Sequence, residues 1–139
     1  MQDNNRKIVI DTNLWISFLI KKQFSTISEL FGNNKLIFSK ELLAELCDVV
    51  ERKKFTKLFS NEHINILFEF IEEYAEIVEV SSKVDICRDK KDNYLLALAK
   101  DSKADYLITG DADLLDLEQF DRTQIIKITD YKLLYNICN

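Results

Sequence analysis

One local design occurs twice in the chain: a short run of strand-forming residues ends at an acidic residue, and a helical segment follows. Ile8-Val9-Ile10 leads directly into Asp11, and Tyr106-Leu107-Ile108 leads, after two small residues, into Asp111. Strands that alternate with helices form parallel sheets, and ligands bind at the carboxyl ends of such strands. Two acidic strand ends at one edge would repel each other without a cation between them. The pattern predicts an α/β fold with a metal site at that edge.

Strand and helix patterns also alternate along the rest of the chain. Strands are predicted at Lys7–Asp11, Lys35–Ser39, Ile77–Val80, Asp105–Thr109 and Gln124–Ile128. Helices are predicted at Asn13–Ile20, Thr26–Phe31, Lys40–Arg52, Asn61–Ala75, Asp89–Lys103, Ala112–Leu117 and Asp130–Ile137, with the clearest turn at 32–34. Right-handed crossovers between these strands favour the sheet order 3-2-1-4-5, which places Asp11 beside Asp111. We expect one domain over residues 1–139.

Composition limits the class of protein. Apolar residues make up 47% and charged residues 31% of the 139 positions, as in a globular domain. The longest apolar run, Leu14 to Ile20, is too short to span a membrane, and the charged N-terminus lacks the apolar core of a signal peptide. The three cysteines are odd in number and show no paired spacing. We therefore expect reduced thiols and a cytoplasmic protein with no membrane partner.

Several catalytic chemistries are excluded by missing residues. His63 is the only histidine, and it falls on an amphipathic segment where a surface position is expected. A zinc site of His and Cys ligands is absent, and so is a glycine-rich phosphate loop. A site made of carboxylates alone suits Mg²⁺ or Mn²⁺. The natural chemistry of such a site is activation of water for an in-line displacement at phosphorus.

Two of the candidate acids lie in the first half of the chain. Asp11 could cap the following helix, but Thr12 and Asn13 can also do so, which favours a metal-binding role for Asp11. Glu45 projects to the border of the apolar face of its helix, from which it can lean over the carboxyl edge of the sheet. An ordinary boundary glutamate would show the same pattern.

The other candidate acids follow in the second half. Asp92 fits a capping box with Asp89, but it also shares the helix face of several leucines, so it points inward and needs a partner. Asp111 could cap a helix or bind metal, and Asp113 is a second possible ligand or an alternative to Asp111. Thr109 offers a hydroxyl that could orient a ligand or a bound water.

The charge balance gives a mixed indication about nucleic acid. The net charge is −5 and the isoelectric point is about 5.0, which argues weakly against a polyanionic partner. Basic clusters nevertheless flank the acidic candidates. The residues expected to contact phosphates are Arg52, Lys53, Lys54, Arg88, Lys90 and Lys91.

Four segments, in order, resemble the motifs of PIN-domain ribonucleases, and most closely the toxin components of toxin–antitoxin systems. Ile8–Asn13 is similar to the opening motif, and Ser39–Leu46 is similar to the second acidic motif. Cys87–Asn93 with Leu95–Ala99 resembles the third motif, and Ala104–Leu115 resembles the fourth. Val50–Phe55 is also typical of this group, which usually carries proline at the position of Lys53.

This resemblance implies a three-layer α/β/α sandwich around a central parallel sheet of four to five strands. It also implies Mg²⁺ or Mn²⁺ dependence, cleavage of single-stranded RNA and frequent homodimers. By motif, the catalytic acids are Asp11, Glu45, Asp92 and Asp111. The first, third and fourth bind one or two metal ions, with Asp113 as a further candidate. Glu45 binds a second ion or acts as general base, and Thr12, Asn13 and Thr109 support the site.

The expected function is that of a metal-dependent endoribonuclease, as the toxin of a toxin–antitoxin pair with a small antitoxin protein as partner. The main alternative is a PIN-like module that binds RNA or a protein without cutting it. A metal-dependent phosphohydrolase or a receiver-like phosphoacceptor domain is a weaker alternative, because no Asp-x-Asp stands at the first strand.

Overall fold

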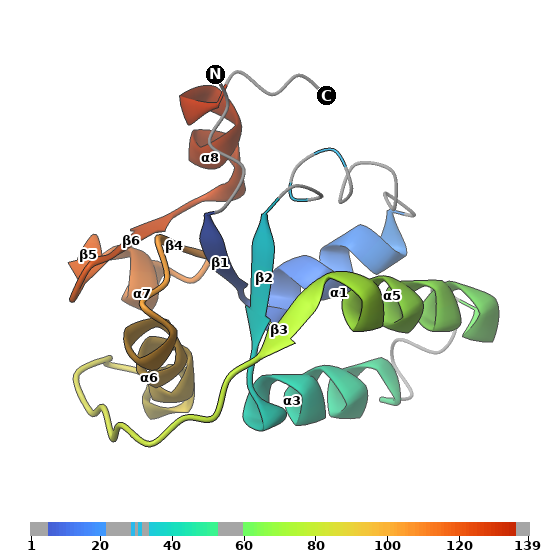
Figure 1. The fold of residues 1–139 in the computed structure, drawn as a ribbon, viewed down its shortest axis with the longest axis horizontal. Helices are drawn as coiled ribbons and strands as arrows, with labels where there is room; N and C mark the ends of the chain where they lie inside the picture. The colour runs from blue at the N-terminus through green and yellow to red at the C-terminus, as the bar shows by residue number, and fades with distance from the viewer. Residues whose placement is uncertain (1–5, 22–28, 30, 32–33, 53–59, 136–139) are drawn as a thin grey trace.

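The computed structural model describes residues 6–21, 29, 31, 34–52 and 60–135, and it contains one central sheet (Figure 1). Five strands run parallel in the order β3-β2-β1-β4-β6. They are β1 (Lys7–Ile10), β2 (Lys35–Phe38), β3 (Ala75–Ile77), β4 (Tyr106–Ile108) and β6 (Thr123–Ile126). This confirms the predicted order 3-2-1-4-5 for the parallel strands.

A sixth strand was not predicted. β5 (Gln119–Phe120) pairs antiparallel with β6 and forms the edge of the sheet. Glu118 and Asp121, on either side of β5, adopt positive φ angles of 61° and 54°, which turn the chain sharply without glycine. A two-residue strand is too short for an alternating pattern to reveal it in the sequence.

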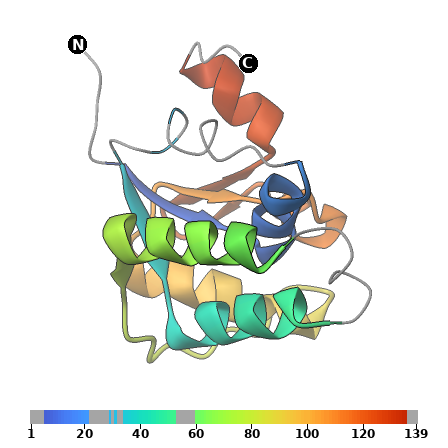
Figure 2. The same ribbon diagram turned by 90° about the vertical axis from the view of Figure 1, so that its right-hand side faces the viewer.

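Helices cover both faces of the sheet, which confirms the α/β/α layering (Figures 1 and 2). α1 (Thr12–Ile20) and α5 (Asn61–Tyr74) lie on one face, and α6 (Asn93–Ser102) and α7 (Ala112–Leu115) lie on the other. α3 (Lys40–Val50) contacts both α1 and α6, so it bridges the two layers. No helix in the described ranges has the length and apolar character that a membrane crossing needs.

Most predicted boundaries differ from the observed ones by a few residues. The predicted helix Asp89–Lys103 is divided into a 3₁₀ turn, η1 (Lys90–Asp92), and α6. The strand predicted at Ile77–Val80 begins earlier, because α5 ends at Tyr74 and Ala75 is already extended. The predicted helix Thr26–Phe31 and the turn at 32–34 fall largely outside the described residues.

Burial on both faces of the sheet explains why apolar and polar residues do not alternate along the central strand. Ile8, Val9 and Ile10 of β1 are all buried, because helices cover both sides of a central parallel strand. The ring of Trp15, from α1, packs against Phe38 at 5.6 Å between centroids. The backbone N–H of Asp11 donates to the carbonyl of Ile108 at 3.0 Å, which joins the carboxyl ends of β1 and β4.

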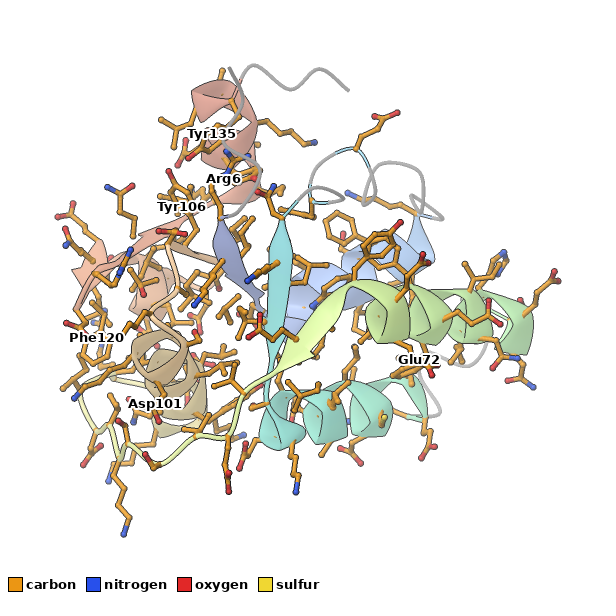
Figure 3. All side chains as sticks on the ribbon, viewed as in Figure 1. Arg6, Glu72, Asp101, Tyr106, Phe120 and Tyr135 are labelled. Carbon is orange, nitrogen blue, oxygen red and sulfur yellow. The ribbon has the colours of Figure 1, made fainter. Side chains whose placement is uncertain are left out.

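The last helix, α8 (Ile128–Leu134), and Tyr135, which follows it, pack at the amino ends of β1 and β4 (Figure 3). The guanidinium of Arg6, just before β1, lies 3.7 Å from the centre of the Tyr135 ring. The hydroxyls of Tyr135 and Tyr106 are hydrogen-bonded at 2.5 Å. The carboxyl ends of β1 and β4 thus remain free of α8.

Candidate metal centre

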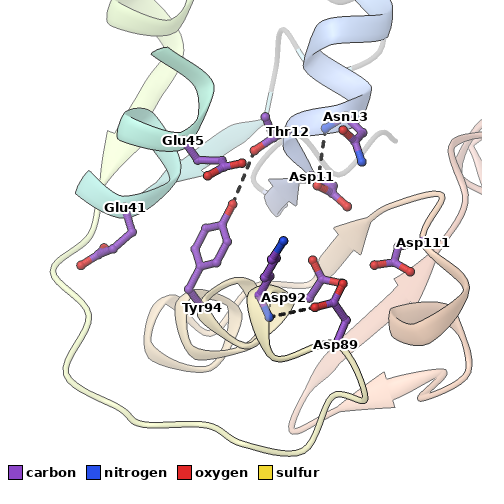
Figure 4. A pocket seen from close by; sticks show the side chains of 10 residues that line it. Asp11, Thr12, Asn13, Glu41, Glu45, Asp89, Asp92, Tyr94 and Asp111 are labelled. Carbon is purple, nitrogen blue, oxygen red and sulfur yellow. Dashed lines mark hydrogen bonds between the residues drawn. The ribbon is translucent and has the colours of Figure 1, made fainter. Parts of the chain in front are cut away.

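A cleft of about 500 Å³ opens where β1 and β4 end, between α3 and α6 (Figure 4). Six acidic residues line it: Asp11, Glu41, Glu45, Asp89, Asp92 and Asp111. Thr12, Asn13, Lys91 and Tyr94 complete the described lining. The four acids predicted to be catalytic therefore share one cleft, although they come from four separate elements of the fold.

Asp11 is held by hydrogen bonds on both carboxylate oxygens. Its Oδ1 accepts a weak bond from the backbone N–H of Asn13 at 3.5 Å, and its Oδ2 accepts a bond from the Thr109 hydroxyl at 2.7 Å. Asp11 is the N-cap of α1, so the expectation that Thr12 or Asn13 would cap this helix is wrong. Burial raises the pKa of Asp11, Thr109 opposes this rise, and the charge of Asp111 adds to it.

Asp89, Asp92 and Asp111 form the tightest acidic group in the described residues. Each offers an oxygen, and these oxygens all lie within 4.8 Å of one another. Asp89 accepts from the backbone N–H of Lys91 at 3.1 Å and caps η1, whereas Asp92 makes no capping bond. Asp89 thus both caps the turn, as predicted, and joins the acidic group, which was not predicted.

The carboxyl of Asp92 is the most perturbed acid in this group. Its pKa is raised to about 8, first by burial, then by a hydrogen-bonding interaction with the Asp111 carboxyl that favours the protonated form, and then by the charges of Asp111, Asp11 and Asp89. Its Oδ2 is buried and has no hydrogen-bond partner among the described residues. A buried carboxylate oxygen without a partner is costly, and a hard divalent cation among carboxylates removes that cost. The donor set therefore fits Mg²⁺ or Mn²⁺.

Thr109 connects the two strand-end acids. Its hydroxyl donates to Asp11 and accepts from the backbone N–H of Asp111 at 3.0 Å. Asp111 in turn caps α7 by accepting from the N–H of Asp113 at 3.0 Å. This chain of bonds sets the relative position of the acids that follow β1 and β4.

Glu45 and Tyr94 form the opposite side of the cleft (Figure 4). Tyr94 reaches from α6 toward Thr12, and the two hydroxyl oxygens are 3.5 Å apart. Burial, together with the charges of Asp11, Glu45 and other acids, raises the pKa of Tyr94 to about 12. Tyr94 and Glu41 were not predicted, although the spacing of Glu41 and Glu45, four residues apart on one helix, was a usable indication.

Asp113 and Arg88 lie outside the described lining of the cleft. The Nε of Arg88 is 3.1 Å from Asp113 Oδ1, and its Nη2 is 2.6 Å from Asp116 Oδ2. A carboxylate paired in this way is turned toward arginine rather than toward the acidic group. The geometry thus favours Asp111 over Asp113 as a ligand, a choice that the sequence left open.

The remaining basic candidates differ in their surroundings. Lys91 lines the cleft, and Lys90 is exposed beside it. Arg52 is exposed and pairs with Asp48 at 3.3 Å. Lys53 and Lys54 fall outside the described residues. Contact of all these residues with phosphates stays a prediction.

Comparisons with known proteins agree with this architecture. The model of the PIN domain family matches residues 7–113. An uncharacterized protein of Methanocaldococcus jannaschii, MJ1680, is 33% identical over 133 residues, which cover 91% of this chain and 83% of that protein. No solved structure shows a significant match. PIN domains are in general nucleases that use divalent metals, and the acidic cleft is suited to that chemistry. The chain belongs to the PIN domain family.

Proposed function

We propose that this PIN domain is an endoribonuclease that depends on Mg²⁺ or Mn²⁺ and cleaves single-stranded RNA. The observation that carries the proposal is the buried Oδ2 of Asp92, which lies within a group of carboxylates and has no hydrogen-bond partner in the part of the chain that the structure describes. Such a group is costly to fold without a cation, so its presence favours metal-dependent chemistry over passive binding.

Each acid has a role in this mechanism. Asp11, Asp92 and Asp111 would hold one or two metal ions, with Asp89 as an additional ligand and Asp113 as the less favoured one. A bound divalent ion supplies positive charge for the attacked phosphate and lowers the pKa of a bound water. Glu45, on the other side of the cleft, accepts the proton of the attacking water or holds a second ion. Thr109 fixes the position of Asp11 relative to Asp111, because its hydroxyl is hydrogen-bonded to both residues.

The substrate would be held by cations around the cleft. Lys91 lies in the lining, and we assign the phosphates on either side of the cleavage site to Arg52, Lys53, Lys54, Arg88 and Lys90. Thr12 and Asn13 support the binding of the substrate at the end of β1. Contacts of this kind release counterions, so RNA binding should weaken as salt increases.

The biological role in this proposal is that of a toxin. The toxin would act in the cytoplasm as a homodimer and would be silenced by a small antitoxin protein. The free thiols of Cys47 and Cys87 are consistent with a reducing compartment. The acidic isoelectric point of about 5.0 suits a basic segment of an antitoxin.

The decisive experiment is cleavage of a mixed single-stranded RNA pool by the purified protein, with Mn²⁺, with Mg²⁺ and with EDTA. We expect cutting only with metal, no cutting by Asp11→Asn, and unchanged cutting by Asp130→Asn, a matched change at an exposed position on α8. Growth arrest on expression in bacteria, relieved by Asp11→Asn, would support the toxin role. RNA binding without metal-dependent cleavage would instead indicate a binding module.

A further inference from the structure

The cleft holds many hydrogen-bond acceptors and few donors. Six of its ten described lining residues are acidic, and an ionised carboxylate can only accept. The side chains that can donate are Thr12, Asn13, Lys91 and Tyr94. A phosphodiester likewise presents acceptor oxygens and a negative charge. A polynucleotide that enters this cleft must therefore find its hydrogen bonds among these few donors.

Tyr94 is the donor whose position is most firmly set. It is the second residue of α6, and the start of that helix is anchored by the buried Asn93. The side-chain oxygen of Asn93 accepts from the backbone N–H groups of Cys87 at 2.9 Å and Ile86 at 3.3 Å. From this base the Tyr94 ring crosses the cleft, and its hydroxyl ends near Thr12 and Glu45 (Figure 4).

The Tyr94 hydroxyl has a defined position in the cleft but makes only a weak hydrogen bond there. Its hydrogen bond with Thr12 measures 3.5 Å, the outer limit for such a bond, and no shorter one is formed within the described residues. Burial and the negative charges of Asp11, Glu45 and Asp92 keep this hydroxyl protonated, because they raise its pKa. A donor at this point faces the space between the proposed base and the acidic group.

A neutral donor suits this position better than a cationic one. A lysine or arginine among these acids would pair with them and compete with a divalent ion for the same oxygens. A phenol donates one hydrogen bond and leaves the negative charge of the acids available to metal. The aromatic ring carries this hydroxyl across the cleft, from α6 to Thr12 at the start of α1.

We propose that the Tyr94 hydroxyl donates a hydrogen bond to a non-bridging oxygen of the phosphodiester that is cleaved. The proposal rests on the nuclease function proposed above, and it names a substrate contact of the same site. When Tyr94 donates its single proton to the substrate, the Thr12 hydroxyl donates to the phenolic oxygen.

The test uses Tyr94→Phe, which removes the hydroxyl and keeps the ring. With Mn²⁺ and single-stranded RNA we expect kcat/KM to fall about 10- to 100-fold, as for loss of one hydrogen bond to a charged group. The affinity for Mn²⁺, measured by calorimetry without RNA, should stay unchanged. The matched control is Tyr74→Phe, on α5 and outside the cleft lining, whose ring packs on Phe70 at 4.6 Å. It should leave both quantities unchanged.

A sulfur-substituted substrate identifies the contact. Sulfur accepts hydrogen bonds poorly, so one phosphorothioate diastereomer at the cleavage site should slow the normal protein. The same substitution should slow Tyr94→Phe much less, because the bond is already lost and the two effects do not add.

Any one of four outcomes would overturn this assignment. Full activity of Tyr94→Phe, or equal sulfur effects in both proteins, would refute the Tyr94 contact and leave the nuclease function standing. A fall in Mn²⁺ affinity that accounts for the lost activity would show that Tyr94 acts on the cation site instead. If the normal protein cleaves no RNA with metal, the proposed function and this contact are both wrong.

Discussion

Replacement of Asp92 by asparagine should stabilise the protein when metal is absent. The Asp92 carboxyl is half-buried, its Oδ2 has no hydrogen-bond partner in the described residues, and its pKa is raised from 3.8 to about 8. The protonated form is therefore the one that the fold favours. Asparagine has nearly the same shape and no charge, so it removes the repulsion from Asp111, Asp11 and Asp89.

The sign and the size of this effect follow from proton linkage. Well below pH 3.8 the carboxyl is neutral in both the folded and the unfolded chain. Between pH 3.8 and about 8 it ionises mainly in the unfolded chain, so the stability of the fold decreases as pH rises. The full pKa difference corresponds to at most about 6 kcal/mol. Because the group is partly exposed, solvent screening reduces this to about 1–2 kcal/mol.

The assay is thermal unfolding in EDTA at pH 5 and pH 8. For a domain of this size we expect Asp92→Asn to melt about 3–8 °C above the normal protein at pH 8. The difference should be smaller at pH 5, and Asp130→Asn should show neither effect. Millimolar Mn²⁺ should reverse the order, since binding to the folded state stabilises the protein that keeps its ligand. Equal or lower melting of Asp92→Asn at pH 8 in EDTA would refute the reasoning.

Two further predictions concern the groups around the acids. Thr109→Val should lower the free energy of unfolding, measured in urea, by about 1–3 kcal/mol and should weaken Mn²⁺ binding, because it leaves the buried Asp11 Oδ2 and the Asp111 N–H without their partner. Unchanged stability would mean that water replaces the hydroxyl. Lys91→Gln should lower the salt dependence of RNA binding by about one counterion, whereas Arg88→Gln should lower it less, since Asp113 and Asp116 already engage that guanidinium. Equal slopes for the two variants would contradict this ranking.

The architecture was readable from the sequence because it depends on local patterns. Ile8-Val9-Ile10 is a fully buried run, and Tyr106-Leu107-Ile108 is buried at its last two residues; acids follow both runs. Right-handed crossovers leave few ways to order such strands. The observed pairing of β1 with β4 follows directly, and with it the proximity of Asp11 to Asp111. Among the described strands, β5 was not predicted, because its two residues, which lie between two positions with positive φ, are too few to form a recognisable run of strand-forming residues.

The side chains of the site were harder to predict because their partners come from distant segments. Nothing near Asp113 in sequence indicates that Arg88 binds it, since the two residues meet only after α6 and β4 have folded. Tyr94 shows the same difficulty. Its position two residues after Asp92 suggests a core residue as readily as a cleft residue. Only the folded position of α6, which brings the Tyr94 hydroxyl to Thr12, decides between them.

The location of the acids on different elements has a consequence for function. Asp11 and Asp111 end two paired strands and are connected through Thr109, so their separation is set by the rigid sheet. Asp92 is the last residue of the short 3₁₀ turn η1 on the opposite layer. Asp89 holds that turn through its carboxylate, which accepts from the Lys91 N–H, and through its carbonyl, which accepts from the Asp92 N–H. A cation that binds both groups would tie the turn to the sheet. Metal binding should therefore order η1 and the start of α6 more than β1 or β4, which slower amide hydrogen exchange confined to residues 89–94 would demonstrate.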